Sequence, residues 1–453
     1  MIRSGIGKIQ AYFSQGHART VQAKINITGT FFLKGLGILL SLLIVPMTIT
    51  YLSPERYGVW IALSSIIGWL SFFDIGFGNG LRNKFVEAIA RGEKELAKIY
   101  VSTTYAILAI IITLVWAVTA VTTFFVDWGK FLNAPKGMSA ELASVVLIVL
   151  TTFAFQFILG LLNTILTALQ KSVMSSLYNT ISQVFLLIGI LVLTKTGNGS
   201  LIYLSLVAGG ANVLVLIAFS FWFYTHDLKE YVPSLKFVKF SYAKDLMGLG
   251  LKFFLIQIIT LIYYETNNII IIKVLNPVSV SVYNVVYKYM SVIGMLFTII
   301  ITPFWSAFSE AKALNDYSWM KNVAKKLRLV TLLIAVFTLL MILISPFVYK
   351  IWLDNKVIVP FILTLLMGFW QIFHVWNTLH STLIYGLGKI KLQLIGSLAI
   401  GIINLPLTIY FCSRWQLNGV VFVQILMAAS ISWIGVLQLN KLLNQSANGI
   451  WNR

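Results

Sequence analysis

The sequence predicts an all-α integral membrane protein, with twelve transmembrane helices in two homologous six-helix bundles around a central cavity. Hydrophobic residues make up 58% of the chain and charged residues 11%, with a mean hydropathy of +0.88. A soluble domain would carry about 25% charge. Runs of about 20 apolar residues, enough to cross a bilayer as helix, recur along the whole chain. They lack the two-residue alternation of outer-membrane strands, which favours helices over a barrel.

The second half of the sequence repeats features of the first. The Pro-containing segment 51–54 has a counterpart at 274–277, and the Phe-x-Glu-Ala pattern at 85–88 recurs at 308–311, both 223 positions later. Residues 164–171 match 382–389 at an offset of 218. Because these matches fall on loop signals rather than on the Leu/Ile background, duplication is favoured over chance similarity. Two homologous bundles around a shared site are typical of transporters.

Six apolar runs in the first half are long enough to span the membrane. They are residues 26–51, 57–78, 99–126, 142–168, 173–194 and 200–224. The segment before them, 1–25, carries basic residues but no compact apolar stretch with a cleavage site, so the first span is expected to stay as an anchor. The sequence therefore predicts an N-terminal segment at 1–25 and an N-terminal bundle at 26–224.

Six further runs follow a polar connection. They are residues 246–274, 279–308, 327–353, 357–385, 391–411 and 417–438. The connection, 225–245, contains Pro233 and is predicted to be a cytoplasmic linker and a candidate hinge. A C-terminal bundle at 246–440 and a cytoplasmic tail at 441–453 complete the predicted organisation.

The charges are distributed unevenly about these spans. The net charge of +20 invites a nucleic-acid partner, but 23 of the 34 Lys and Arg residues fall on the termini and even-numbered loops, against 8 on the opposite side. Cytoplasmic loops of membrane proteins carry such an excess. The pattern places both termini in the cytoplasm and excludes nucleic acid as the partner.

The sequence offers no motif for a cofactor, a metal or a catalytic reaction. It contains no Gly-Lys-Ser/Thr phosphate loop and no His-Glu-x-x-His, and Cys412 is the single cysteine. The predicted outward loops are also short, which leaves little room for the active site of a glycan polymerase. We therefore expect a transporter rather than an enzyme.

A few ionisable residues fall inside predicted spans, where a charge is costly and often functional. Glu265 stands 12 residues before Pro277 and Lys288 stands 11 after it, so both lie roughly 16–18 Å below the same outer loop. Asn268 and Asn284 share their helix faces, and these four residues are predicted to line one cavity. The pair could instead only pin the packing of two helices. In the functional alternative, Lys288 contacts an anionic substrate and Glu265 titrates to couple a proton.

Other intramembrane polar residues carry weaker predictions. Lys34, beside Gly35 and Gly37, either lines the cavity or extends toward the interface, whereas Lys252 is better explained by such snorkelling. Asp74 precedes a Gly-rich stretch and suits a turn.

The tenth predicted span carries His374 and Asn377 beside Trp370, Phe373 and Trp376. Aromatic faces beside amides and imidazoles suit sugar rings, although aromatic residues also mark membrane interfaces. His374 and Asn377 are therefore candidate substrate contacts.

Local sequence features resemble a known family of transporters. The stretches 51–60 (YLSPERYGVW), 74–78 (DIGFG) and 83–88 (NKFVEA) look like those of Wzx-type polysaccharide flippases, in the multidrug/oligosaccharidyl-lipid/polysaccharide exporter superfamily. The resemblance implies a V-shaped pair of six-helix bundles that alternates its opening. It also implies translocation of undecaprenyl-diphosphate-linked oligosaccharides across the bacterial cytoplasmic (inner) membrane, for O-antigen, capsule or exopolysaccharide synthesis.

The deep charges agree with that implication. The net charge of the ionisable residues deep in the spans is +2, from Lys34, Lys252 and Lys288 against Glu265. A positive net charge favours a diphosphate-linked sugar over a cationic drug. A coupling ion, H⁺ or Na⁺, and polysaccharide polymerase or assembly proteins are possible partners. The alternatives are a multidrug or other small-molecule exporter of the same superfamily and, less favoured, a membrane polysaccharide polymerase or ligase.

Overall fold

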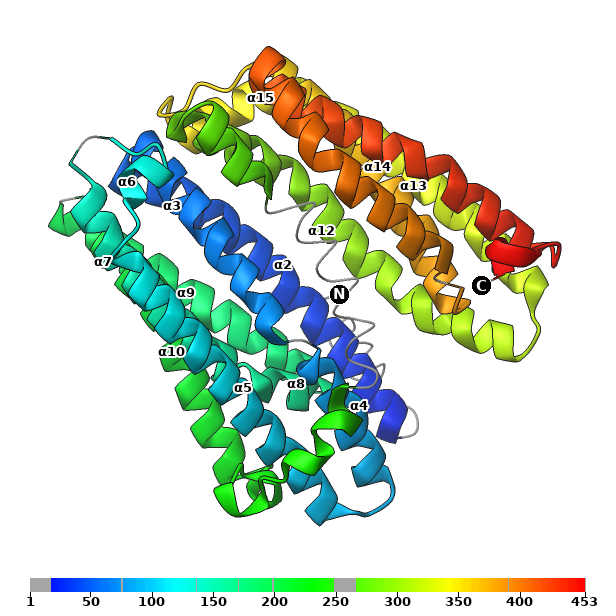
Figure 1. Cartoon of the computed structure of the whole chain (residues 1–453). Coiled ribbons are helices and arrows are strands. Elements are labelled where there is room, and N and C mark those ends of the chain that lie inside the picture. Colours follow the sequence, from blue (N-terminus) through cyan, green and yellow to red (C-terminus); the bar gives the residue numbers. More distant parts are fainter. Residues whose placement is uncertain are drawn as a thin grey trace, which may run out of the picture.

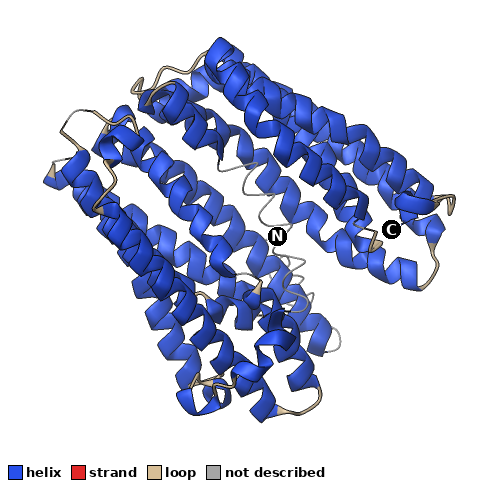
Figure 2. Ribbon diagram, in the orientation of Figure 1, coloured by secondary structure: helices blue, strands red, loops and turns tan. Residues whose placement is uncertain are grey.

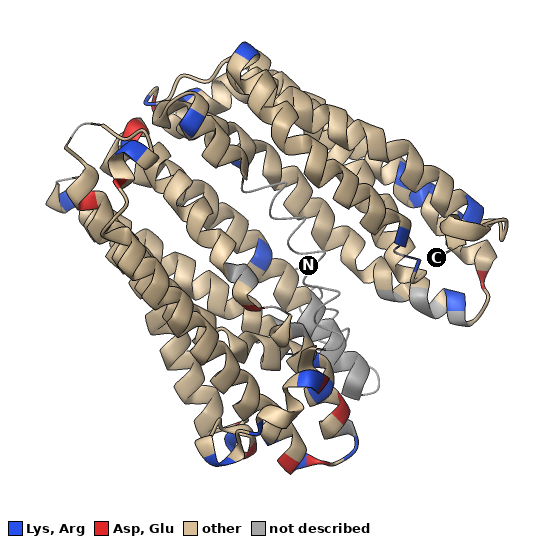
Figure 3. Ribbon diagram, in the orientation of Figure 1, with Lys and Arg blue, Asp and Glu red and all other residues tan. Residues whose placement is uncertain are grey.

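The computed structural model describes residues 18–74, 76–135, 137–169, 171–197, 199–247, 266–389 and 391–452. Every regular element in these ranges is helical (Figure 2). Nine helices within them are long and apolar enough to cross a membrane. Charged residues gather near the ends of the bundles and are sparse along the middle of the helices (Figure 3). The prediction of an all-α, multi-pass membrane protein is confirmed.

The first half of the chain forms one bundle, the N lobe. Its elements are α2 (Ala18–Leu52), α3 (Pro54–Gly68), η1 (Trp69–Asp74), α4 (Phe77–Ala90), α5 (Lys94–Thr123), α6 (Trp128–Phe131), α7 (Ser139–Leu159), α8 (Leu161–Ala168), α9 (Ser172–Thr196) and α10 (Leu201–Thr225). The predicted second span, 57–78, is divided between α3, η1 and the start of α4. Gly76 makes that division, because its φ of 82° caps α4 in a conformation that glycine adopts without steric cost.

The predicted linker packs along the N lobe. Its short helices are η2 (Lys229–Tyr231), η3 (Leu235–Phe237) and η4 (Phe240–Tyr242). The Tyr231 ring lies edge-on to Phe85 at 5.1 Å, and the Ser234 amide donates to Ser102 Oγ at 3.1 Å. The described part of this segment therefore packs against the N lobe, and its role as a hinge stays a prediction.

The second half forms the C lobe, made of residues 266–452. It contains α12 (Pro277–Ala313), α13 (Tyr317–Leu353), α14 (Phe361–Gly386), α15 (Lys391–Leu443) and η5 (Gly449–Asn452). Most of the predicted seventh span, 246–274, lies outside the described residues.

Helix α15 contains both of the last two predicted spans. The backbone leaves helical geometry at Gln416, with φ 53° and ψ −137°. The Phe411 and Phe422 rings lie 5.4 Å apart across the bend, so the two halves run side by side. Gly419 permits this turn, because an ideal Cβ there would lie 2.0 Å from the Phe411 carbonyl oxygen. With α3 as a short span and the seventh span undescribed, the prediction of twelve helices is consistent with the structure.

The two lobes meet at one end and diverge toward the other (Figure 1). The end where they meet, here called the contact end, carries the start of α3 and the start of α12. One hydrophobic cluster joins Val59 and Leu63 of α3 to Val282 and Val286 of α12. The hydrogen bonds between the lobes in the described part of the chain lie on this side.

These bonds are few and mostly uncharged. Trp352 Nε1 donates to the Leu42 carbonyl at 2.7 Å, Lys356 Nζ to Thr50 Oγ1 at 2.8 Å, and Asn133 Nδ2 to the Ile272 carbonyl at 2.7 Å. The contact end is therefore closed by packing and by modest hydrogen bonds.

Candidate functional site

A cavity of about 390 Å³ lies between the lobes, on the divergent side of the α3–α12 contact. Its walls come from α2 and α9 of the N lobe and from α12 of the C lobe. On each helix the lining positions recur three or four residues apart, so each helix turns one face toward the cavity. The lining residues are Leu33, Lys34, Gly37, Ile38, Ser41, Ser176, Asn179, Thr180, Gln183, Lys288, Met295, Thr298 and Ile299.

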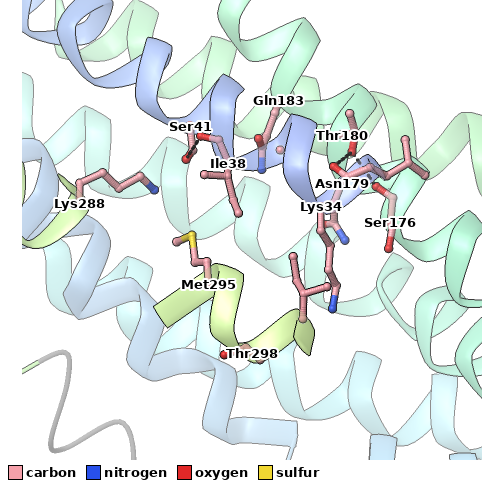
Figure 4. A pocket seen from close by; sticks show the side chains of 13 residues that line it. Lys34, Ile38, Ser41, Ser176, Asn179, Thr180, Gln183, Lys288, Met295 and Thr298 are labelled. Atoms are coloured by element: carbon pink, nitrogen blue, oxygen red, sulfur yellow. Dashed lines mark hydrogen bonds between the residues drawn. The ribbon is translucent and has the colours of Figure 1, made fainter. Parts of the chain in front are cut away.

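Two predicted residues, Lys34 and Lys288, share this cavity. Lys288 reaches from α12 toward α2, and Lys34 enters from the N lobe (Figure 4). Lys34 is exposed and Lys288 is half-buried. None of the ion pairs among the described residues involves either amine, and no described acidic residue lines the cavity. The described walls are therefore electropositive and suited to an anion.

Polar side chains of α9 form the facing wall. Ser176, Asn179 and Gln183 lie along one face, and Thr180 Oγ1 donates to the Leu33 carbonyl of α2 at 3.2 Å. Gln183 Oε1 is buried with no hydrogen-bond donor in the described part of the chain. As an isolated polar residue of the predicted span 173–194, Gln183 would be expected to form an interhelical hydrogen bond rather than to line a cavity. The three-to-four-residue spacing of these polar residues was the signal that could have placed it in the cavity wall.

Asn268 and Asn284 line a second pocket, of about 280 Å³, at the α3–α12 contact. The other lining residues are Ile61, Ser64, Ser65, Tyr283 and Tyr287. Asn284 Nδ2 donates to Asn268 Oδ1 at 2.8 Å, and Asn268 Nδ2 donates to Ser65 Oγ of the N lobe at 2.9 Å. Asn284 precedes Lys288 by one helical turn. The predicted polar stripe on α12 therefore serves two adjacent pockets.

His374 and Asn377 lie within the C lobe and line neither pocket. The His374 ring stacks on Trp370, with centroids 5.2 Å apart. Asn377 Nδ2 donates to the Ala428 carbonyl at 2.8 Å and Asn377 Oδ1 accepts from Ser432 Oγ at 2.9 Å, so Asn377 ties α14 to α15. Their roles as substrate contacts stay predictions.

The remaining predicted residues occupy other places. Glu265 and Lys252 lie outside the described residues. Asp74 Oδ1 accepts from the Gly78 amide at 2.8 Å, as expected of a turn. No group of three His, Cys, Asp or Glu side chains that could hold a metal occurs in the part of the chain that the structure describes.

Sequence and structure comparisons relate this architecture to known proteins. The family model described as "Polysaccharide biosynthesis protein" matches residues 24–311. A Yersinia pseudotuberculosis protein described as a candidate O-antigen export protein is 21% identical over 356 residues, which cover 75% of this chain and 78% of the relative.

Two solved structures have the same fold. An inward-facing multidrug resistance MATE family transporter of the MOP superfamily superimposes with a TM-score of 0.72 at 15% identity, covering 92% of this chain and 96% of its own. The lipid II flippase MurJ, in an inward closed conformation, gives 0.67 at 15% identity, covering 94% and 93%. Since the family model covers more than half of the sequence, the chain belongs to the polysaccharide biosynthesis protein family.

Proposed function

We propose that this protein is a flippase for undecaprenyl-diphosphate-linked oligosaccharides in the bacterial cytoplasmic membrane, serving surface polysaccharide synthesis. The observation that carries the proposal is the placement of Lys34 and Lys288, from opposite lobes, in one cavity whose described lining contains no acid. A diphosphate cannot enter hydrocarbon unpaired at reasonable cost. Two ammonium groups in a polar cavity supply the compensating charge, while the prenyl tail stays in lipid between the lobes.

Transport in this proposal proceeds by alternating access. The Lys- and Arg-rich loops orient the termini toward the cytoplasm, which makes the contact end the outer end. The described bonds between the lobes all lie on that side, so the present conformation suits loading from the cytoplasm. Closing the inner end and separating the outer contacts would deliver the head group to the other leaflet.

A multidrug exporter is the second candidate, because a transporter of that class shares the fold. A carboxylate or an aromatic face would favour an organic cation, and the described lining residues include neither. The electropositive lining therefore favours the anionic substrate.

A complementation experiment tests the proposal. Lys288→Ala and Lys34→Ala, each expressed in a strain lacking the native gene, are expected to reduce surface polysaccharide at least ten-fold with normal protein levels, because a charge-assisted contact contributes about 1.5–3 kcal/mol. Lys195→Ala, which removes an exposed amine at the end of α9, is the matched control. Polymer output unchanged by both cavity substitutions would overturn the proposal.

Coupling to H⁺ or Na⁺ is a separate part of the proposal, in which Glu265 exchanges the ion. Glu265→Gln is expected to remove the dependence of transport in proteoliposomes on a proton gradient. Transport that keeps its normal gradient dependence in this variant would exclude Glu265 from coupling.

A further inference from the structure

We propose that the pocket at the α3–α12 contact binds the sugar attached to the diphosphate, and that this sugar replaces the hydrogen bonds that hold the outer end closed. The inference rests on the proposed function and adds a glycan subsite and a link between loading and opening. The pocket, formed by Ser64, Ser65, Asn268, Tyr283, Asn284 and Tyr287 together with Ile61, is called the gate pocket below.

The chemistry of the gate pocket suits a neutral polyhydroxyl group. Its polar side chains are hydroxyls and amides, which both donate and accept hydrogen bonds. None of the described residues that line it is charged. Its volume of about 280 Å³ lies just below the range of pockets for drug-sized ligands, about 300–1,000 Å³, and therefore suits one sugar ring rather than a chain of them.

Aromatic rings stand beside these polar groups. The Tyr283 and Tyr287 rings are stacked with centroids 6.3 Å apart, and Trp370 lies 5.8 Å from Tyr287. Gln424 Nε2 donates to the Tyr283 hydroxyl at 2.9 Å, which fixes that ring. The C–H face of a pyranose packs against such rings, because the ring face carries partial negative charge and the C–H groups carry partial positive charge.

The position of the pocket matches the covalent structure of the substrate. Asn284 is four residues from Lys288, a rise of about 6 Å along α12. In a lipid-linked oligosaccharide the first sugar is bonded directly to the diphosphate. With the diphosphate at Lys288, that sugar is within reach of Asn284 and Tyr287.

The same pocket holds the lobes together. The Ser65–Asn268 hydrogen bond crosses from one lobe to the other, and Asn284 Nδ2 holds Asn268 Oδ1 from the other side. Separating the lobes here breaks the crossing bond and leaves Ser65 and Asn268, which are both buried, in need of new partners. Sugar hydroxyls supply those partners. A loaded transporter therefore opens at the outer end more easily than an empty one.

Binding measurements on the intact protein in lipid nanodiscs separate the two subsites. The probes are farnesyl diphosphate and farnesyl diphosphate carrying one N-acetylglucosamine, each titrated calorimetrically. Tyr287→Leu is expected to weaken binding of the sugar-bearing probe about five-fold and to leave the sugarless probe unchanged. Lys288→Ala weakens both. Tyr410→Leu, which changes an exposed tyrosine on α15, is the matched control and alters neither.

If Tyr287→Leu fails to fold, Ser64→Ala provides the same comparison with a smaller change. It is expected to weaken binding of the sugar-bearing probe about three-fold and to leave binding of the sugarless probe unchanged. If the gate-pocket variants bind both probes as the wild type does, the glycan subsite is wrong while the proposed function stands. If the wild type binds neither probe, the proposed function fails and this inference with it.

Distances between spin labels test the link to opening. Labels at Lys130→Cys and Lys350→Cys, both exposed near the contact end on different lobes, are introduced with Cys412→Ala. The sugar-bearing probe is expected to lengthen the distance between the labels, and farnesyl diphosphate is not. Equal effects of the two probes would refute replacement of the gate hydrogen bonds by sugar.

Discussion

Individual residues in this protein fall into two kinds, those whose polar groups are satisfied within a lobe and those that face a cavity. Asn377 is of the first kind, since both ends of its amide bond α15. Gln183 is of the second kind, since its buried Oε1 has no donor among the described residues. At the cavity wall such an acceptor is placed to receive a hydrogen bond from a ligand or from water.

Substitution of these two amides is expected to have different effects on stability. Gln183→Leu is expected to leave the thermal midpoint unchanged or raised, because it removes an unmet acceptor, while transport falls. Asn377→Leu is expected to destabilise by about 1 kcal/mol, the usual range for interhelical hydrogen bonds in membranes. Thermal unfolding in detergent and transport in proteoliposomes measure the two effects. A large loss of stability in Gln183→Leu would show that this side chain is structural.

At the scale of helices, the pair α3 and α12 forms the closure of the contact end. Gly58 makes their approach possible, because an ideal Cβ there would lie 1.8 Å from the Pro277 carbonyl oxygen. Ser281 Oγ also donates to the Pro54 carbonyl in this region. At Gly58 the close neighbour is backbone, so a change of rotamer cannot relieve a clash with an added Cβ.

Gly58→Ala is therefore expected to favour the conformation in which the two lobes are separated at the contact end. The substitution suits the helix itself, since Ala has the higher helix propensity, so folding is preserved. The distance between labels at positions 130 and 350 should lengthen without any ligand. Gly35→Ala is the control, because nothing lies within 4 Å of its ideal Cβ. A distance unchanged by Gly58→Ala would mean that the two helices separate by another route.

At the scale of the whole molecule, alternation requires that neither conformation be strongly preferred. The described bonds across the contact end are mainly neutral hydrogen bonds, and the Lys356–Thr50 pair is exposed. Each contributes about 0.5–1.5 kcal/mol. Ligand binding can shift an equilibrium of that size. The 229–242 segment packs on the N lobe.

Trp352→Phe tests this balance. It removes the donor to the Leu42 carbonyl. The population in which the contact end is closed should therefore fall about five-fold relative to the population in which it is open. Spin-label distance distributions give the two populations. Trp433→Phe, a change at an exposed tryptophan of α15, should leave them unchanged. If Trp352→Phe has the same ratio of closed to open conformations as Trp433→Phe, the Trp352 hydrogen bond does not contribute to closure.

The sequence predicted the helical membrane fold and the doubled organisation because these depend on local properties. Long apolar runs require helices in lipid, and loops such as 51–54 and 274–277 carry their own turn signals. The same reasoning ran the second span, 57–78, through Gly76, where the chain passes from η1 to α4. It also could not show that the 225–245 segment packs against Phe85 and Ser102, because such contacts are not visible in a local pattern.

The sequence alone determined which residues are costly in a membrane, and so singled out Lys34, Lys288, Asn268 and Asn284. Only the tertiary structure decided their grouping. It placed the two amines in one cavity, moved the two asparagines to the closure beside it, and placed His374 and Asn377 within the C lobe. The physical reason is that depth follows from position along a helix, whereas the partner that a helix face meets is set by how the two lobes pack.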